Sequence, residues 1–102
     1  MSLLFHLIPR DEWAAAPDPY RPAGFDQLGF VHLSTSEHLD IPGRALFAGR
    51  DDVLLLVLDP GRLHDVRFEE GVPPTPGVHF PHLYGPLPHD AVLDVLPYRA
   101  PS

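Results

Sequence analysis

Cysteine and lysine are both missing from this sequence of 102 residues. Without cysteine, disulfides, thiolate catalysis and thiolate zinc sites are excluded. All seven basic residues are arginines, and against 14 acidic residues they leave a formal net charge of −7. Because the arginines are scattered and the balance is acidic, the chain is poorly suited to phosphate backbones, and no nucleic-acid partner is expected.

Long apolar runs are missing as well. No stretch approaches the roughly 20 residues that span a bilayer, so no membrane partner is expected. The N-terminus lacks a basic region followed by a long apolar segment, which is the pattern of a signal peptide. We therefore expect a cytoplasmic protein. The 14 prolines fix φ and remove backbone donors, so any helices should be short.

What the sequence does contain is enough apolar material for one core. Hydrophobic residues make up 44% of the chain, and ten residues are aromatic. This composition favours a folded globule over a disordered chain. The length is close to the common domain size, so residues 1–102 are expected to form a single domain.

Six segments have the composition of β-strands. Residues 53–58 form an uninterrupted apolar run, which predicts a strand covered on both faces at the centre of a sheet. Residues 3–8 also carry apolar side chains on both faces, and we expect a central strand there too. Residues 71–77, rich in glycine and proline, predict a surface loop, and residues 24–29 predict a loop or a bulged approach to the strand at Phe30. The six expected strands are residues 3–8, 30–34, 53–58, 66–69, 82–84 and 91–96.

Two short helices are expected near the early strands. The first covers residues 11–16, with Asp11 as its N-cap. The second runs to about residue 48, where Gly49 suits the position after a helix end, and Pro42 and Gly43 should disturb its middle. Many strands beside few helices favour an α+β domain over a doubly wound sheet. The second helix has three candidate caps: Ser34, Thr35 and Ser36.

Polar side chains recur on three of the apolar strands. In residues 30–34 the alternation of a strand places Phe30, His32 and Ser34 on one face. His6 interrupts the first strand, and His82 and Tyr84 interrupt a late one. If these strands are neighbours, the polar side chains line one pocket. Histidine and hydroxyl groups there would hydrogen-bond ribose, amide or phosphate, and Phe30 or Tyr84 would stack on a ring.

Each of these side chains also has an ordinary structural explanation. His6 and His32 are explained equally by buried rings bonded to backbone carbonyls, and Ser34 by a helix cap. Tyr84 is explained by a core aromatic with its hydroxyl at the edge. A three-histidine metal site stays open as an alternative, although the spacing gives it no support and no metal ligand is assigned. A serine nucleophile is disfavoured, because His32 and Ser34 project in parallel from one strand.

Five segments of the sequence together resemble the domain-of-unknown-function family DUF952, a family of small bacterial and plant proteins. They are residues 5–7, 29–35, 49–52, 66–69 and 80–87, and they span nearly the whole chain. The family's fold is similar to that of the ADP-ribosyltransferases, in which a split mixed or antiparallel β-sheet holds NAD in a cleft. The resemblance therefore implies an α+β, ADP-ribosyltransferase-like domain with NAD as the ligand or substrate.

The resemblance also implies roles for particular residues. In ADP-ribosyltransferases a histidine of the first strand binds the ribose on the nicotinamide side, which corresponds to His6. The second segment here offers His32, Ser34 and Thr35. The late segment offers histidine and tyrosine without the glutamate that orients the nucleophile in ADP-ribosyltransferases, and Glu69 is the nearest acidic candidate.

The leading hypothesis is a cleft that binds NAD, ADP-ribose or a related nucleotide, with cleavage or transfer at a glycosidic or phosphate-linked position. Whether the protein is an enzyme stays open. The alternatives are a non-enzymatic module for a small ligand or protein, and a histidine-based metal-dependent hydrolase. His32 and His82 are the candidate acid–base residues. The candidate ligand-binding residues are His6, Phe30, Ser34, Thr35 and Tyr84.

Overall fold

Six strands and a few short helices make up residues 2–101, which this computed structural model describes. No helix in that range is long and apolar enough to cross a membrane. The elements in chain order are β1 (Leu4–Pro9), α1 (Arg10–Ala14), α2 (Phe25–Leu28), β2 (Val31–His32), α3 (Asp40–Phe47), β3 (Val53–Leu58), the 3-10 turn η1 (Pro60–Arg62), β4 (Val66–Thr75), β5 (Val78–Leu83), the 3-10 turn η2 (His89–Ala91) and β6 (Val92–Tyr98).

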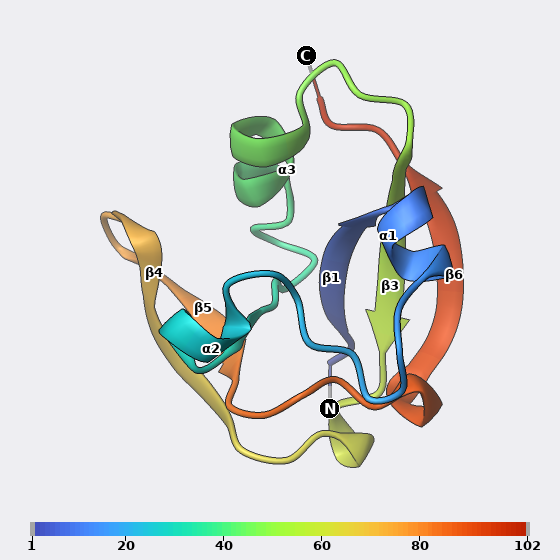
Figure 1. Cartoon of the computed structure of the whole chain (residues 1–102). Coiled ribbons are helices and arrows are strands. Elements are labelled where there is room, and N and C mark those ends of the chain that lie inside the picture. Colours follow the sequence, from blue (N-terminus) through green and yellow to red (C-terminus); the bar gives the residue numbers. More distant parts are fainter. Residues whose placement is uncertain (1, 102) are drawn as a thin grey trace.

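The strands form two three-stranded antiparallel sheets, in the orders β1-β3-β6 and β2-β5-β4. Figure 1 shows the first sheet beside α1 and the β4–β5 hairpin on the opposite side of the molecule. One bridge joins the two sheets: the backbone N–H groups of Phe5 and Ser34 each donate to the other residue's carbonyl, at 2.9 and 2.8 Å. The expected α+β class with antiparallel sheets and few helices is confirmed.

The core lies between the facing sides of the two sheets. Leu56 and Leu58 of β3 are fully buried, and Val31 and Leu33 approach them from the second sheet. Trp13 of α1 packs against the same cluster. Because alternate residues of each strand point inward, the core takes one side chain in two and leaves the others for the second face.

Two strand expectations are wrong in detail. A strand does form near residues 3–8, as β1, but it is an edge of its sheet, and on its free side Phe5 forms a bridge with Ser34. Residues 71–77 were expected to be a loop, but β4 continues to Thr75. The pairing of β4 with β5 becomes irregular between Glu70 and Thr75, and β4 is an edge strand, so prolines without an N–H are tolerated there.

Helix α3 begins later than the sequence suggests. Ser34 was a candidate cap, but its backbone is paired with Phe5, and the helix starts only at Asp40, without a side-chain cap. Pro42 therefore falls in the first turn, where its missing N–H has no helical acceptor, and the helix continues undisturbed. Gly49 follows the helix with φ at +76°, as expected for a residue after a helix end.

One further helix was not expected. Residues 24–29 were expected to form a loop or a bulged approach to the next strand, but α2 occupies Phe25–Leu28. It is a single turn flanked by Gly24 and Gly29, which have φ of +86° and +81°. Glycine adopts these left-handed conformations without steric cost, so the same residues that indicated a loop also begin and end this turn.

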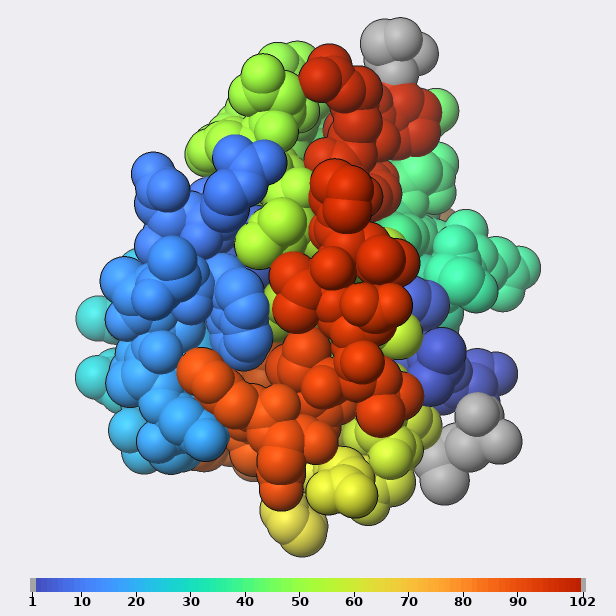
Figure 2. Space-filling model, turned by 90° about the vertical axis from the view of Figure 1, so that its right-hand side faces the viewer, coloured from blue at the N-terminus to red at the C-terminus, as the bar shows by residue number. Residues whose placement is uncertain are grey.

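Strand β6 is the other edge of the first sheet and runs along the face shown in Figure 2. Leu93, Val95 and Leu96 on this strand are exposed. Pro97 lies within the strand and cannot donate a hydrogen bond, and Asp94 adds a charge. Both features oppose pairing of this edge with another chain.

Helix α3 is held against β6 by the close approach of Gly43 to Tyr98. A Cβ atom on Gly43 would overlap the hydroxyl of Tyr98 and lie 3.0 Å from its Cζ. Gly43→Ala should therefore lower the free energy of unfolding by about 1–2 kcal/mol, since overpacking outweighs the better helix propensity of alanine. Urea denaturation measures the change. The double variant with Tyr98→Phe should recover part of it, and full additivity of the two substitutions would contradict the contact.

Candidate functional site

A cavity of about 300 Å³ opens where β1 separates from the segment that follows β2. Helix α3 forms one wall, and the β4–β5 hairpin forms the opposite one. Most of the lining is apolar, and its polar groups come chiefly from β1 and the segment after β2. Strand β1 contributes His6 and Leu7 to the lining. Strand β2 and the residues after it contribute His32, Leu33 and Ser34.

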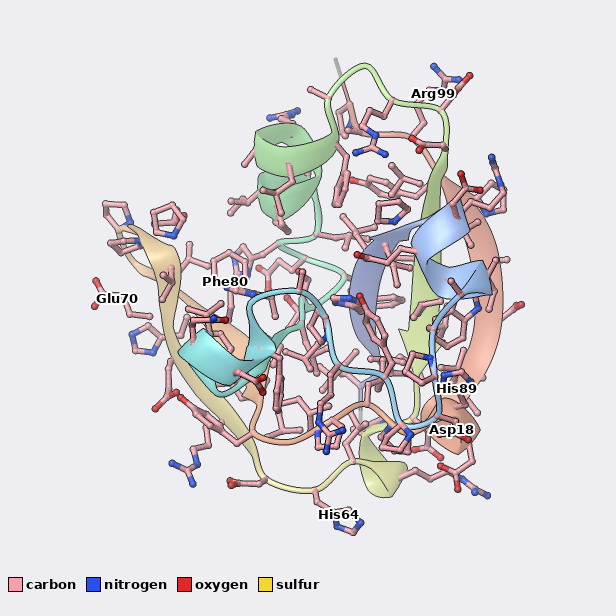
Figure 3. The ribbon with its side chains drawn as sticks, viewed as in Figure 1. Asp18, His64, Glu70, Phe80, His89 and Arg99 are labelled. Carbon is pink, nitrogen blue, oxygen red and sulfur yellow. The ribbon has the colours of Figure 1, made fainter. Side chains whose placement is uncertain are left out.

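The two walls were not anticipated as part of a site. Helix α3 contributes Ile41 and Ala45, one turn apart, together with Phe47, while Val72 and Phe80 come from the hairpin. Figure 3 labels Phe80 on β5. Ile41 and Ala45 share one face of α3 because they lie four residues apart. The sequence carried no signal that the hairpin would lie across from it.

His6 is fixed in one tautomer by the neighbouring segment. Its Nδ1 lies 2.7 Å from the carbonyl oxygen of His32. A carbonyl oxygen only accepts, so Nδ1 carries the hydrogen and donates it. Burial lowers the pKa of His6, and this outweighs the opposing effects of that hydrogen bond and of Glu12. The ring is therefore neutral near pH 7, and its Nε2 is an acceptor.

His32 lines the cavity while keeping solvent exposure. Partial burial of the ring lowers its pKa, and the neighbouring His82 lowers it further, whereas hydrogen bonding to the backbone of Val72 opposes both. The rings of His32 and His82 lie 6.1 Å apart, on residues that are direct partners in the β2–β5 ladder. His32 is thus the more accessible of the two candidate acid–base groups.

Ser34 and Thr35 have contrasting positions. Ser34 is only 5% exposed and lines the cavity, and within residues 2–101 its hydroxyl has no hydrogen-bond partner. Thr35 does not line the cavity, although its Oγ1 is buried and also lacks a partner within that range. The desolvation cost of a buried hydroxyl without a partner therefore falls on Thr35, whereas the Ser34 hydroxyl is not among the enclosed atoms without a partner, and its residue lines the cavity.

The other predicted residues form a separate cluster behind His32. Phe30 lies at its centre, with ring centroids 4.1 Å from His82 and 5.6 Å from Tyr84. His82 is 2% exposed, and its Nδ1 donates to the carbonyl oxygen of Phe80 at 2.8 Å. The expected single pocket is therefore divided, because neither His82 nor Tyr84 lines the cavity.

Tyr84 and Glu69 are joined on the outer side of that cluster. The Tyr84 hydroxyl donates to the Glu69 carboxylate, and this hydrogen bond raises the pKa of the phenol. The Arg67 guanidinium lies over the Tyr84 ring, 4.5 Å from its centroid, and also pairs with Asp65. Glu69 is thus engaged away from the cavity, and Tyr84 faces a second, more open concavity.

In the part of the chain that the structure describes, no group of three histidine or acidic side chains is placed to bind a metal ion.

Comparison with known proteins gives one family and one solved relative. A model of the DUF952 family, described as proteins of unknown function, matches residues 7–95. The crystal structure of protein CC0527 from Caulobacter crescentus is 29% identical with a TM-score of 0.82, covering 94% of this chain and 85% of that one. A crystallised double mutant of CC0527 is 28% identical with a TM-score of 0.81, at the same coverage. The solution structure of CC0527 is 27% identical with a TM-score of 0.73, covering 100% and 89%. No curated protein matches the chain.

Proposed function

The chain belongs to the DUF952 family of proteins of unknown function, and on that premise we propose that its cavity binds one end of NAD, ADP-ribose or a related nucleotide. The observation that carries the proposal is a polar edge on an otherwise apolar cavity, formed by His32 and Ser34, which lie two residues apart on one face of the same extended segment. The volume is near the lower end of the roughly 300–1,000 Å³ range of ligand sites, which suits a ring with a ribose better than a whole dinucleotide.

The ADP-ribosyltransferase-like fold is part of the same proposal. Two antiparallel sheets that meet at a single bridge between Phe5 and Ser34 form a split arrangement, and the cavity lies beside the split. A nucleotide entering there would contact β1 and the segment after β2. A fold alone does not establish an activity, so the proposal depends on the cavity. A cytoplasmic location belongs to the proposal as well.

Any turnover is assigned to His32. It lines the cavity, and its lowered pKa leaves the ring neutral near pH 7 and able to take a proton from a bound nucleophile. His82 is buried behind Phe30 and does not line the cavity. Its proximity helps to lower the pKa of His32. Thr35 and Glu69 do not line the cavity, so neither has a direct part in this scheme.

A non-enzymatic binding module is the second candidate function. The observation in its favour is the apolar character of both walls, where Leu46 and Val72 are 66% and 55% exposed. Exposed apolar side chains at the rim suit an apolar ligand or peptide. Incubation with NAD followed by chromatography separates the two functions, because only an enzyme releases nicotinamide or another product.

Filling the cavity should abolish nucleotide binding. Ala45 lines the cavity from α3, and Ala45→Trp would occupy it, whereas Ala48 lies just beyond the helix and outside the lining. We expect NAD or ADP-ribose affinity, measured by calorimetry, to fall at least tenfold in Ala45→Trp and to stay unchanged in Ala48→Trp. Failure of both ligands to bind the native protein at millimolar concentration, or equal binding to both variants, would refute the proposal.

A further inference from the structure

Strand β4 turns one row of backbone hydrogen-bonding groups away from the molecule. It is the outer strand of the order β2-β5-β4, and Figure 1 shows it at the margin of the structure. The N–H of Tyr84 donates to the carbonyl oxygen of Asp65, while Val66 is the partner of Leu83. Because hydrogen-bonded and non-hydrogen-bonded pairs alternate along an antiparallel ladder, the odd-numbered residues bond to β5. The backbone groups of the even-numbered residues therefore face outward, and these are Val66, Phe68 and Glu70.

The part of this edge that a further strand could join is short. Asp65, just before β4, has φ of +55°, and the pairing of β4 with β5 becomes irregular after Glu70. Pro73 and Pro74 lie beyond that point and carry no backbone N–H. A second strand can therefore align with residues 66–70, where the outward groups supply roughly six hydrogen bonds.

The charges on this edge are self-complementary in one register. Arg67 and Glu69 flank Phe68 and share one face of the strand. When two β4 strands pair antiparallel about a two-fold axis at Phe68, Arg67 of each copy lies opposite Glu69 of the other. Moving the axis by one residue places Arg67 opposite Arg67, or Glu69 opposite Glu69, and these like charges repel. Charged side chains protect most edge strands against pairing, but here their order favours one arrangement.

Both charged groups keep atoms for this contact. Arg67 donates to Asp65 from Nε and Nη2, and within residues 2–101 its Nη1 has no hydrogen-bond partner. Glu69 accepts from Tyr84 at Oε1, and Oε2 has no partner in the same range. The pair of Arg67 with Glu69 falls at a non-hydrogen-bonded position, where opposite side chains approach most closely. Phe68 is 56% exposed, and pairing with its own copy would cover it.

We propose that β4 pairs with β4 of a second copy of this chain, antiparallel about Phe68, so that the two β2-β5-β4 sheets join across a two-fold axis. The contact is smaller than a standard interface, which buries roughly 800 Å² per partner, so the dimer is reversible, with a dissociation constant in the micromolar range. It is independent of the nucleotide proposal, because none of residues 66–70 lines the cavity.

Sedimentation equilibrium from micromolar to millimolar concentration should show a monomer and a dimer. Arg67→Glu brings like charges together and should weaken the dimer at least tenfold. Combining it with Glu69→Arg restores opposite charges in the same register and should recover most of the native affinity. Arg50→Glu is the matched control, because it changes the net charge equally and breaks a similarly exposed pair with Asp52. It should leave the dimer unchanged.

Hydrogen exchange of the native protein gives a second measurement that needs no variant. The amides of Val66, Phe68 and Glu70 should exchange more slowly at millimolar than at micromolar concentration. The amides of Arg67 and Glu69, which already bond to β5, should not change.

A protein that stays monomeric up to millimolar concentration overturns the proposal, and so does a dimer that protects the amides of β6 instead of those of β4. Equal effects of Arg67→Glu and Arg50→Glu on the dimer also overturn it. A double variant that dimerises no better than Arg67→Glu would contradict the register about Phe68.

Discussion

Leu33→Ala is expected to lower the free energy of unfolding by about 2–5 kcal/mol, the cost of removing a buried leucine side chain from a packed core. Leu33 is 2% exposed and belongs to the cluster between the two sheets. It also lies between His32 and Ser34 in sequence, with its side chain on the opposite face of the strand. Its burial therefore holds the two polar residues in the cavity, and the variant should lose ligand affinity as well as stability.

Leu46→Ala is the matched control for this prediction. The same atoms are removed, but Leu46 is 66% exposed on α3, so its loss should cost no more than about 0.5 kcal/mol. Urea denaturation of both variants gives the two free energies, and unchanged m-values would show that the unfolded states are comparable. Similar losses in the two variants would mean that Leu33 is not part of the core.

The strand pattern was predictable because it depends on local alternation. The continuous apolar run of β3 fits a strand with partners on both sides, and its observed bounds, Val53–Leu58, equal those expected. The alternation around His32 was also correct: Val31 and Leu33 enter the core, while Phe30 and His32 pack on the other face. Local periodicity fixes which face a side chain occupies.

The walls of the site were not predictable, because they depend on contacts distant in sequence. Ser34 has the chemistry of a helix cap, but its backbone pairs with Phe5, 29 residues earlier in the sequence. The helix α3 therefore begins only at Asp40. The prolines of the hairpin suggested a loop, and only the position of β4 at a sheet edge lets the strand continue. The division between the cavity and the Phe30 cluster follows from these long-range pairings.

Acidification below about pH 6.5 is expected to destabilise the folded protein. The ordinary histidine pKa of 6.5 applies to the unfolded chain, and burial lowers the pKa of His6 in the folded one. Between these two values the unfolded state binds the proton and the folded state does not. The contribution of His6 to the free energy of unfolding is therefore fully present above pH 6.5. It declines as the pH falls, by up to about 1.4 kcal/mol per pH unit. His32 adds to the decline, reduced by its exposure to solvent.

His6→Asn should flatten this decline, because asparagine keeps a donor toward the His32 carbonyl and cannot titrate in this range. The lowered carboxyl pKa values of Asp52 and Asp65 affect stability only below about pH 3.8, so they do not overlap with the histidine window. Urea midpoints measured between pH 7.5 and 5.0 give the slope for each protein, with His64→Asn as the control at an exposed histidine. If His6→Asn keeps the native slope while His64→Asn loses it, burial of His6 is not the source of the acid sensitivity.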